Sequence, residues 1–298
     1  MFFRLPVMAL PHRVSIIPPM RLGGPITRAG RNPEEWILAA KKRGYSACEV
    51  PFNHEAPEDW ILAFAEAASK ENIVIAEAGA WSNPIDPDQE KAKKALIFCQ
   101  NQLALADQIG ARCCVNIAGS RNPQRWDGPD AENFSDETFD LIVESVRKII
   151  DAVKPSRTFY TLETMPWIFP SSPDEYLALI KAIDRPSFAV HFDPVNMLNS
   201  PVRAYRNADF IRECFEKLGP WIKSCHAKDI VLDPKLTVHL QEARPGTGLV
   251  DYAVFLKEIS KLGNDCPLFL EHLATDEEYA AGANYIREVA KVHQIEIH

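Results

Sequence analysis

The sequence predicts an α/β protein built as one (β/α)8 TIM barrel, a single domain that spans residues 1–298. Three observations support this fold class. The chain has 298 residues, a length at which such barrels are commonly undivided. Short apolar segments alternate with amphipathic helical segments from end to end, which is typical of strand–helix units around a parallel sheet. No GxGxxG turn follows the first apolar segment, which argues against an open dinucleotide-binding sheet and against a nicotinamide or flavin cofactor.

Eight short apolar segments are the predicted barrel strands. The first unit is the weakest, because residues 18–31 form a long stretch rich in Gly and Pro. We expect this stretch to be an active-site loop. In chain order the predicted strands are 13–17 (RVSII), 46–52 (SACEVPF), 73–80 (IVIAEAGA), 111–119 (ARCCVNIAG), 157–163 (RTFYTLE), 187–193 (SFAVHFD), 221–229 (WIKSCHAKD) and 267–273 (PLFLEHL).

Helices between these strands are indicated by capping residues and by apolar spacing. A Ser, Thr or Asn followed three residues later by Glu can satisfy the free N–H groups of a first turn. Apolar residues at 3 and 4 spacing then mark the face that packs on the sheet, as after residue 172 and near 137–153 and 278–292. The predicted caps and their partners are Asn32 with Glu35, Ser172 with Glu175, and Thr275 with Glu278.

Composition excludes several function classes. The net charge of -8 argues against nucleic acid or an anionic membrane as the main partner. No apolar segment is long enough for a membrane span, and the first residues lack a convincing signal-peptide cleavage site, so we expect a cytoplasmic protein. The seven cysteines include no CxxC pair, and we expect them to be reduced and structural.

Ionisable residues at four strand ends carry the functional prediction. Glu163, Asp193, His226 and Glu271 each close, or nearly close, a predicted strand. The active site of a (β/α)8 barrel lies at the carboxyl ends of its strands, and a buried charge there is costly unless it meets a counter-charge or a metal. Four on consecutive strands indicate one shared ion. The alternative is that they are separate salt-bridge or hydrogen-bond partners at the barrel rim.

The ligand types indicate which ion such a site would hold. Three carboxylates and one imidazole suit hard divalent cations, with Mn²⁺ or Mg²⁺ preferred and Zn²⁺ or Co²⁺ compatible. Mn²⁺ is our first choice. We therefore expect a divalent metal to be the cofactor.

Four segments resemble the xylose-isomerase-like TIM-barrel superfamily of sugar (phosphate) isomerases and epimerases. They are TLETMPW (161–167), HFDPVN (191–196), CHAKD with the following EARPGTGLVDY (225–229 and 242–252), and LFLEHL (268–273). The superfamily also contains inosose dehydratases, hydroxypyruvate isomerases, dehydroshikimate dehydratases and, more distantly, endonuclease IV. The resemblance implies that Glu163, Asp193, His226 and Glu271 are the metal ligands, and that Glu163 and Glu271 also act as the catalytic proton carriers.

This resemblance implies chemistry next to a carbonyl group. A metal on adjacent substrate oxygens would stabilise an enediolate while two carboxylates remove and return a proton. The leading hypothesis is therefore a metal-dependent isomerase or epimerase acting on a small sugar or polyol. The rival on the same scaffold is a carbon–oxygen lyase or dehydratase acting on a keto-sugar, keto-glycoside or inosose.

One position departs from the ketose epimerases of the superfamily. They carry a substrate-binding histidine three residues after the metal aspartate, where this chain has Asn196. An amide can hydrogen-bond a hydroxyl group but cannot titrate or carry charge. Asn196 therefore weakens the ketose 3-epimerase assignment and favours the lyase alternative.

Several further residues are candidate substrate contacts, each with a structural alternative. Arg244 resembles the arginine that family members place near substrate oxygens, although it can equally be a solvated loop residue. Trp81, Trp126 and Trp167 follow strand ends, where aromatic walls suit sugar faces. His272 alternates away from Glu271, so we interpret it as structural. The predicted substrate-binding residues are His191, Asn196, Lys228, Arg244, Glu77 and Asn116.

Two other classes of function are less favoured. A nuclease of the endonuclease IV type would need more histidine ligands and a basic surface, whereas the chain has eight histidines and a charge of -8. An accessory barrel within a larger enzyme is opposed by the intact ligand set. The sequence leaves open whether the chain forms a homo-oligomer or works with a partner subunit.

Overall fold

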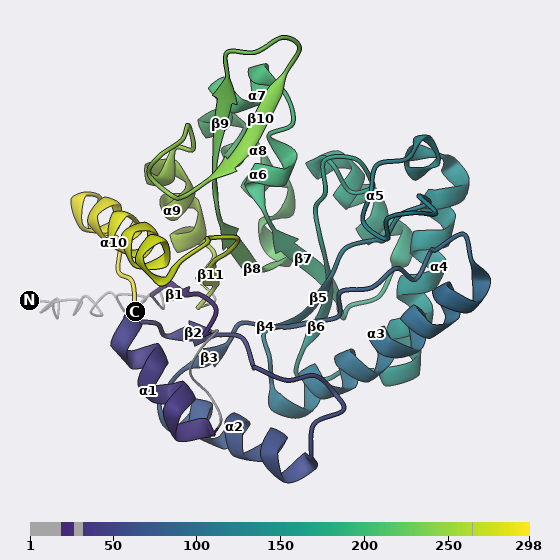
Figure 1. Cartoon of the computed structure of the whole chain (residues 1–298), viewed down its shortest axis with the longest axis horizontal. Helices are drawn as coiled ribbons and strands as arrows, with labels where there is room; N and C mark the ends of the chain where they lie inside the picture. Colours follow the sequence, from purple (N-terminus) through teal and green to yellow (C-terminus); the bar gives the residue numbers. More distant parts are fainter. Residues whose placement is uncertain (1–18, 27–31, 264) are drawn as a thin grey trace, which may run out of the picture.

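Across the residues that the structure describes (19–26, 32–263 and 265–298), nine parallel strands form a nearly closed barrel surrounded by helices (Figure 1). The structure is a computed structural model. The barrel strands are β1 (Arg21–Gly23), β2 (Ala47–Cys48), β3 (Val74–Ile75), β4 (Glu77–Gly79), β5 (Cys113–Asn116), β6 (Phe159–Glu163), β7 (Phe188–Phe192), β8 (Ile222–Ala227) and β11 (Pro267–Leu270).

These strands occupy eight positions around the barrel. β3 and β4 are halves of one stretch interrupted only at Ala76, and they lie at opposite ends of the order β3-β2-β1-β11-β8-β7-β6-β5-β4. β3 pairs with β2 and β4 pairs with β5, so this stretch closes the ring. The predicted (β/α)8 barrel is therefore confirmed, and the last seven predicted strands lie where expected.

The stretch 18–31 was expected to be a loop, but part of it is a strand. The segment RVSII at 13–17 lies outside the described residues, and β1 lies instead within the stretch expected to be a loop. Arg21 and Gly23 stand opposite Pro267 and Phe269 of β11. A Cβ on Gly23 would lie 2.2 Å from the Ala47 carbonyl oxygen, so only glycine allows this approach to β2. Glycine content that suggested a loop therefore serves close strand packing.

Helices connect successive strands and cover the outside of the barrel. The three predicted capping side chains, Asn32, Ser172 and Thr275, all accept the expected backbone N–H group. The α-helices are α1 (Pro33–Arg43), α2 (Glu58–Lys70), α3 (Gln89–Ile109), α4 (Asp136–Val153), α5 (Pro173–Ile183), α6 (Pro194–Met197), α7 (Pro201–Tyr205), α8 (Asn207–Leu218), α9 (Tyr252–Lys261) and α10 (Asp276–Val292), with 3-10 turns η1 (Ala131–Phe134) and η2 (Gly219–Trp221).

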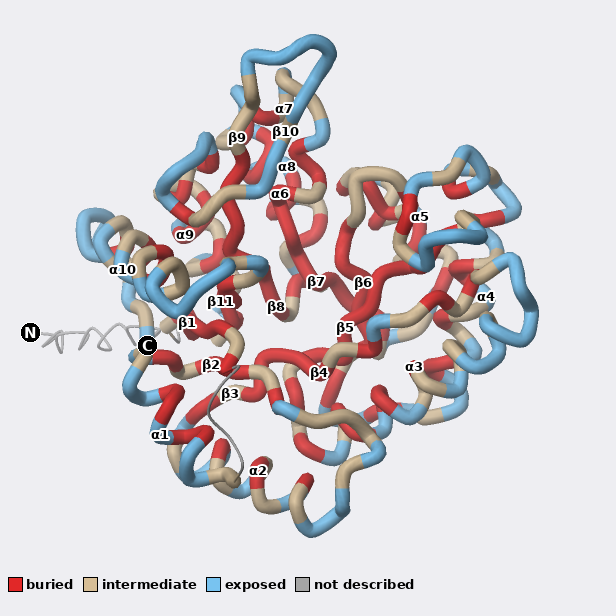
Figure 2. Tube along the Cα trace, viewed as in Figure 1, coloured by how far each residue is buried: buried red, intermediate tan, exposed pale blue. Residues whose placement is uncertain are grey.

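The main apolar core lies between the strands and the inner faces of the helices, while exposed residues follow the outer helix surfaces (Figure 2). A small separate apolar cluster is made by Ala47, Ala76 and Phe269. All seven cysteines are unpaired and buried, as predicted. Among the described residues, no helix has both the length and the apolar character needed to cross a membrane.

A β-hairpin that the sequence did not predict follows β8. β9 (Asp229–Asp233) and β10 (His239–Ala243) pair antiparallel and project away from the barrel at the top of the view in Figure 1. The hairpin begins where β8 ends, so it stands beside the carboxyl ends of the strands. Its turn carries Leu236, which is 98% exposed.

Candidate metal centre

Four ionisable side chains converge at the carboxyl ends of four neighbouring strands. Glu163 ends β6, Asp193 follows β7, His226 lies on β8 and Glu271 follows β11. Each offers a ligand atom, and these atoms all lie within 4.8 Å of one another. Asp193 and His226 are fully buried, and Glu163 is almost so. The four residues predicted to share an ion are therefore neighbours in space.

His226 lies at the centre of this group. Its Nδ1 atom is 3.0 Å from Glu271 Oε2 and 3.2 Å from Glu163 Oε1. The nearest Asp193 oxygen, Oδ2, is 3.7 Å away. Burial opposes a charged imidazole, but the surrounding carboxylates of Glu271, Glu163 and Glu77 outweigh it and raise the pKa of His226 well above its usual value.

Lys228 supplies a second positive group to the same carboxylates. Its buried Nζ lies 2.6 Å from Glu271 Oε2, 2.8 Å from Asp193 Oδ2 and 3.4 Å from Glu163 Oε1. Burial alone would lower the pKa of this lysine, but the carboxylates raise it well above the usual range. Lys228 therefore remains an ammonium ion, and salt bridges are part of the cluster.

The residues fit a divalent cation. Asp193 Oδ2 and Glu271 Oε2 are buried, and within the described residues they accept no hydrogen bond of good geometry. With His226 neutral, as binding a metal through Nδ1 requires, the three carboxylates would carry three negative charges, and the ammonium of Lys228 would balance one. A divalent ion would balance the other two, and carboxylate oxygens with one imidazole are ligands that such ions accept. The cluster is therefore a candidate site for a divalent metal.

The two glutamates of the cluster have different environments. Burial raises the pKa of Glu163 to about 7. Burial acts on Glu271 in the same direction, but the positive charges of His226 and Lys228 prevail and lower its pKa. A pair of carboxyl groups whose pKa values are pushed apart is suited to give and take protons.

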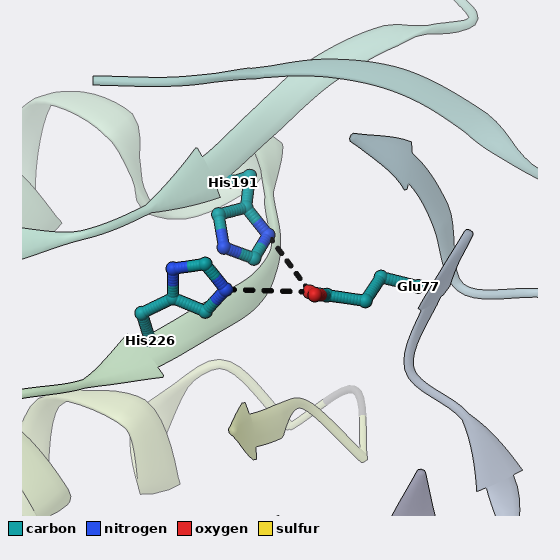
Figure 3. A group of neighbouring side chains, drawn as sticks. All are labelled: Glu77, His191 and His226. Atoms are coloured by element: carbon teal, nitrogen blue, oxygen red, sulfur yellow. Dashed lines mark ion pairs between the residues drawn. The ribbon is translucent and has the colours of Figure 1, made fainter. Parts of the chain in front are cut away.

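The other side of the His226 ring faces a second group inside the barrel (Figure 3). His226 Nε2 is 3.5 Å from Glu77 Oε2, and His191 Nδ1 is 3.7 Å from the same oxygen. All three side chains are buried, and none of them lines the open cavity described next, which is lined by Glu163 and Glu271. Glu77 and His191, predicted to contact substrate, thus lie behind the cluster.

An open cavity of about 460 Å³ gives access to the cluster. We call it the metal cavity. Its polar lining includes Glu163, Glu271 and Asn196, and its apolar wall is rich in aromatic rings. The wall residues are Trp81, Ile117, Trp126, Met165, Pro166 and Trp167. A polar floor under an aromatic wall suits a small ligand with several hydroxyl groups.

Comparison with known proteins identifies the family. A family model described as xylose isomerase-like TIM barrel matches residues 37–289. The chain belongs to this family. None of the curated protein sequences compared with this chain matches it.

Several solved structures share the fold at low sequence identity. A Mycobacterium smegmatis protein in complex with magnesium is 17% identical, with 92% of this chain and 97% of that chain covered and a TM-score of 0.65. The 3-keto-D-glucoside 4-epimerase of E. coli is 15% identical, with 90% of this chain and 99% of that chain covered and a TM-score of 0.67. Endonuclease IV of Thermus thermophilus is 13% identical, with 91% of this chain and 99% of that chain covered and a TM-score of 0.70. Such identities show the fold and leave the reaction open.

Three of the residues predicted to bind substrate have distinct placements in this xylose isomerase-like barrel. Asn196 lines the metal cavity and donates from Nδ2 to Glu163 Oε1 at 3.1 Å. Asn116 is fully buried and donates to the Tyr160 hydroxyl group, on the helix side of β5. Arg244 donates to the carbonyl oxygen of Pro245 and does not line the metal cavity.

Residues beyond the predicted set also surround the cluster. Glu242, on β10, places Oε1 3.3 Å from Lys228 Nζ and lines the metal cavity. His272 lines it too, with Nδ1 2.9 Å from Glu242 Oε2. The strand alternation that predicted His272 to face away does not apply, because β11 ends at Leu270.

Glu49 is a further acidic residue that sequence reasoning missed. It follows β2 directly, and burial raises its pKa to about 7, with the negative charges of Glu77 and Glu271 acting in the same direction. The strand-end rule that selected Glu163 could have found it, because Glu49 lies within the predicted strand 46–52 near its carboxyl end.

Proposed function

We propose that this protein is a divalent-metal-dependent isomerase or epimerase that moves a proton next to the carbonyl group of a small sugar or polyol derivative. The observation that supports this most is the placement of Glu163 and Glu271. Both line the metal cavity, both lie beside His226, and their pKa values are shifted in opposite directions. Two such carboxyl groups can act as acid and base on one substrate.

The chain's own residues suffice to describe the proton transfer. Glu163, Asp193, His226 and Glu271 would hold the ion, and a divalent ion there would stabilise negative charge on adjacent substrate oxygens. One glutamate takes the proton from the carbon next to the carbonyl, and the other returns a proton to a neighbouring atom or the opposite face. Asn196 orients Glu163 through its 3.1 Å hydrogen bond. Mn²⁺ is the proposed native ion, with Mg²⁺, Zn²⁺ and Co²⁺ as alternatives.

A lyase reaction is the second candidate, and Asn196 favours it. Asn196 lines the metal cavity, where its amide can hydrogen-bond a hydroxyl group but cannot titrate. One glutamate of the cluster would remove the proton from carbon, and the other would give a proton to the departing oxygen. The two reactions share their first step and differ in whether a leaving group is expelled.

Solvent-deuterium exchange tests the shared first step. Metal-loaded protein is incubated in D₂O with free ketoses, inososes and 3-keto-glucosides, and products are followed by NMR and mass. We expect deuterium next to the carbonyl in at least one substrate, loss of exchange on chelation, and a decrease of about 100-fold or more in Glu163→Gln and Glu271→Gln. A lower product mass identifies elimination.

Glu258→Gln is the matched control for this experiment, because Glu258 lies on the outer helix α9 and pairs with Lys261. It should exchange at the wild-type rate. Wild-type exchange in both active-site variants would show that other residues move the proton and would contradict the proposal.

A further inference from the structure

A second cavity adjoins the metal cavity. It has a volume of about 550 Å³ and lies between the β6–α5 loop, α6 and the β9–β10 hairpin. We call it the hairpin cavity. Both cavities are lined by Pro166, Trp167, Asn196 and Glu242. Because these residues border both spaces, one ligand can extend from the metal cavity into the hairpin cavity.

The hairpin cavity has a largely apolar lining. Val195, Leu198 and Ile230 form its base and belong to the buried core, so their positions are fixed by packing. Leu240 and Val238 of the hairpin complete the wall, and Val238 is 52% exposed. A half-exposed valine facing an open apolar cavity is a surface that an apolar ligand can cover.

The polar side chains around this cavity already have partners. Gln241 Nε2 donates to Asp233 Oδ2 at 2.8 Å, and Asn199 Oδ1 accepts from Arg203 at 3.0 Å. The Trp167 indole donates to the Asp127 carbonyl oxygen at 2.8 Å, which holds the ring in place. A ligand rich in hydroxyl groups would therefore find few partners here, whereas a flat apolar ring could pack on Trp167.

We propose that the hairpin cavity is a second subsite, which binds an aromatic group joined to the sugar in the metal cavity. This inference rests on the proposed function, because it assumes that the sugar occupies the carboxylate-lined space. The substrate class is then an aromatic glycoside or its oxidised derivative. A second sugar unit is the alternative occupant, and the test must separate the two.

Calorimetric titration of metal-loaded protein provides this test. The probes are 4-nitrophenyl β-D-glucopyranoside, methyl β-D-glucopyranoside and cellobiose. We expect the Kd of the nitrophenyl glucoside to be lower than that of the methyl glucoside by about tenfold or more, because binding transfers the added aromatic ring from water to the apolar cavity. Cellobiose should bind like the methyl glucoside, since its second ring is polar.

Val238→Glu places a charge on the wall of the hairpin cavity without touching the carboxylate cluster. It should abolish the preference for the nitrophenyl group and change the Kd of the methyl glucoside by less than about twofold. Val292→Glu is the matched control, because Val292 is 74% exposed at the end of α10 and lines neither cavity. This control should keep the preference.

Several results would overturn the subsite. They are equal Kd values for the two glucosides, an equal gain with cellobiose, a preference that survives Val238→Glu, or no binding of any probe. The measurement needs no turnover, so a binding preference in a protein that exchanges no deuterium would contradict only the proposed reaction. Exchange with simple sugars but no preference would contradict only the subsite.

Discussion

His226 presents its two ring nitrogens to two different sets of carboxylates. Nδ1 faces Glu163 and Glu271, while Nε2 lies 3.5 Å from Glu77 Oε2. An imidazole that binds a metal through one nitrogen commonly donates the N–H of the other to a carboxylate, which fixes the ring and its tautomer. Glu77 is therefore expected to act as a positioning residue for His226.

The first prediction concerns Glu77→Gln. The negative charge of Glu77, 3.5 Å from Nε2, favours a proton on that nitrogen, whereas a neutral amide that can also turn its NH₂ group toward the ring would no longer favour this tautomer. We expect the affinity for Co²⁺ to fall by about 10- to 100-fold. Competition with a chromogenic chelator measures the affinity, and the visible absorption bands of bound Co²⁺ should shift. Glu258→Gln on α9 should change neither quantity.

The result against this prediction is equally definite. Glu77→Gln with wild-type Co²⁺ affinity and an unchanged spectrum would mean that Glu77 has no influence on the ion site. Circular dichroism on the same samples shows whether the variant is folded, so a loss of affinity through unfolding is recognised.

At the residue level, one physical rule was enough to predict which charged side chains converge, but it could not predict which way a single residue faces. Charged residues at the ends of buried strands located Glu163, Asp193 and His226, because burial of charge requires a partner. Asn116 was assigned to the cavity but faces the helices, and its neighbour Ile117 lines the cavity instead. The facing of a single residue depends on where the strand begins, which the sequence alone does not show.

One buried carboxylate joins the base of the β9–β10 hairpin to the loop that follows the hairpin. Asp229 accepts four backbone N–H groups, at 2.9 to 3.0 Å. The donors belong to Ile230 on the hairpin and to Gly246, Gly248 and Val250 in the loop that follows it. A Cβ on Gly248 would lie 2.4 Å from Asp229 Oδ1, so this approach requires glycine.

The second prediction is that Asp229→Asn lowers the free energy of unfolding by about 1–3 kcal/mol, because one acceptor oxygen becomes a donor that faces N–H groups. Urea denaturation measures the change. Asp233→Asn is the matched control on the same hairpin. Its carboxylate contacts only the exposed side chains of Lys235 and Gln241 among the described residues, so this change should cost less than about 1 kcal/mol. Equal costs for both variants would show that Asp229 does not anchor the loop.

Elements were predictable in proportion to their length and regularity. The long helices have caps and apolar faces that are written in the local sequence, as at Ser172 and Thr275. β1 has three residues and is followed by Gly24 and Pro25, so local composition pointed to a loop. The hairpin depends on Asp229 reaching a loop 17 to 21 residues away, and no local pattern reports that contact.

Several acidic groups lie close together in the barrel, and the ionisation of Glu49 makes the stability of the fold depend on pH. Its pKa in the folded chain is about 7, above its usual value of 4.5. Between these values the folded chain binds more protons than the unfolded chain, so the contribution of Glu49 to stability falls as the pH rises through this range. Above pH 7 the partly buried carboxylate is ionised and destabilises the fold.

The third prediction follows from this sign. In chelator, which excludes a bound cation, Glu49→Gln should have a larger free energy of unfolding than the wild type at pH 8, and the difference should shrink toward pH 5. Urea denaturation at both pH values measures it. An advantage of equal size at both pH values would show that the effect comes from packing and not from ionisation.

At the level of the molecule, the sequence predicted the fold class because alternation of strand and helix extends through the chain, and it predicted a shared site because barrel geometry brings strand ends together. The shape of the cavities was not predictable. This shape depends on how the loops after β4, β5 and β6 pack against one another and against the hairpin, and these segments are far apart in the chain.

The order of the strands has a consequence for engineering. The four candidate ligands lie on or directly after β6, β7, β8 and β11, which are adjacent in the barrel and belong to the second half of the chain. Trp81, Ile117 and Trp126, on the facing wall, come from the first half. A chimera could take the residues before β6 from another barrel of this family. It would then replace much of the substrate-facing wall, while all four candidate ligands would still come from this chain.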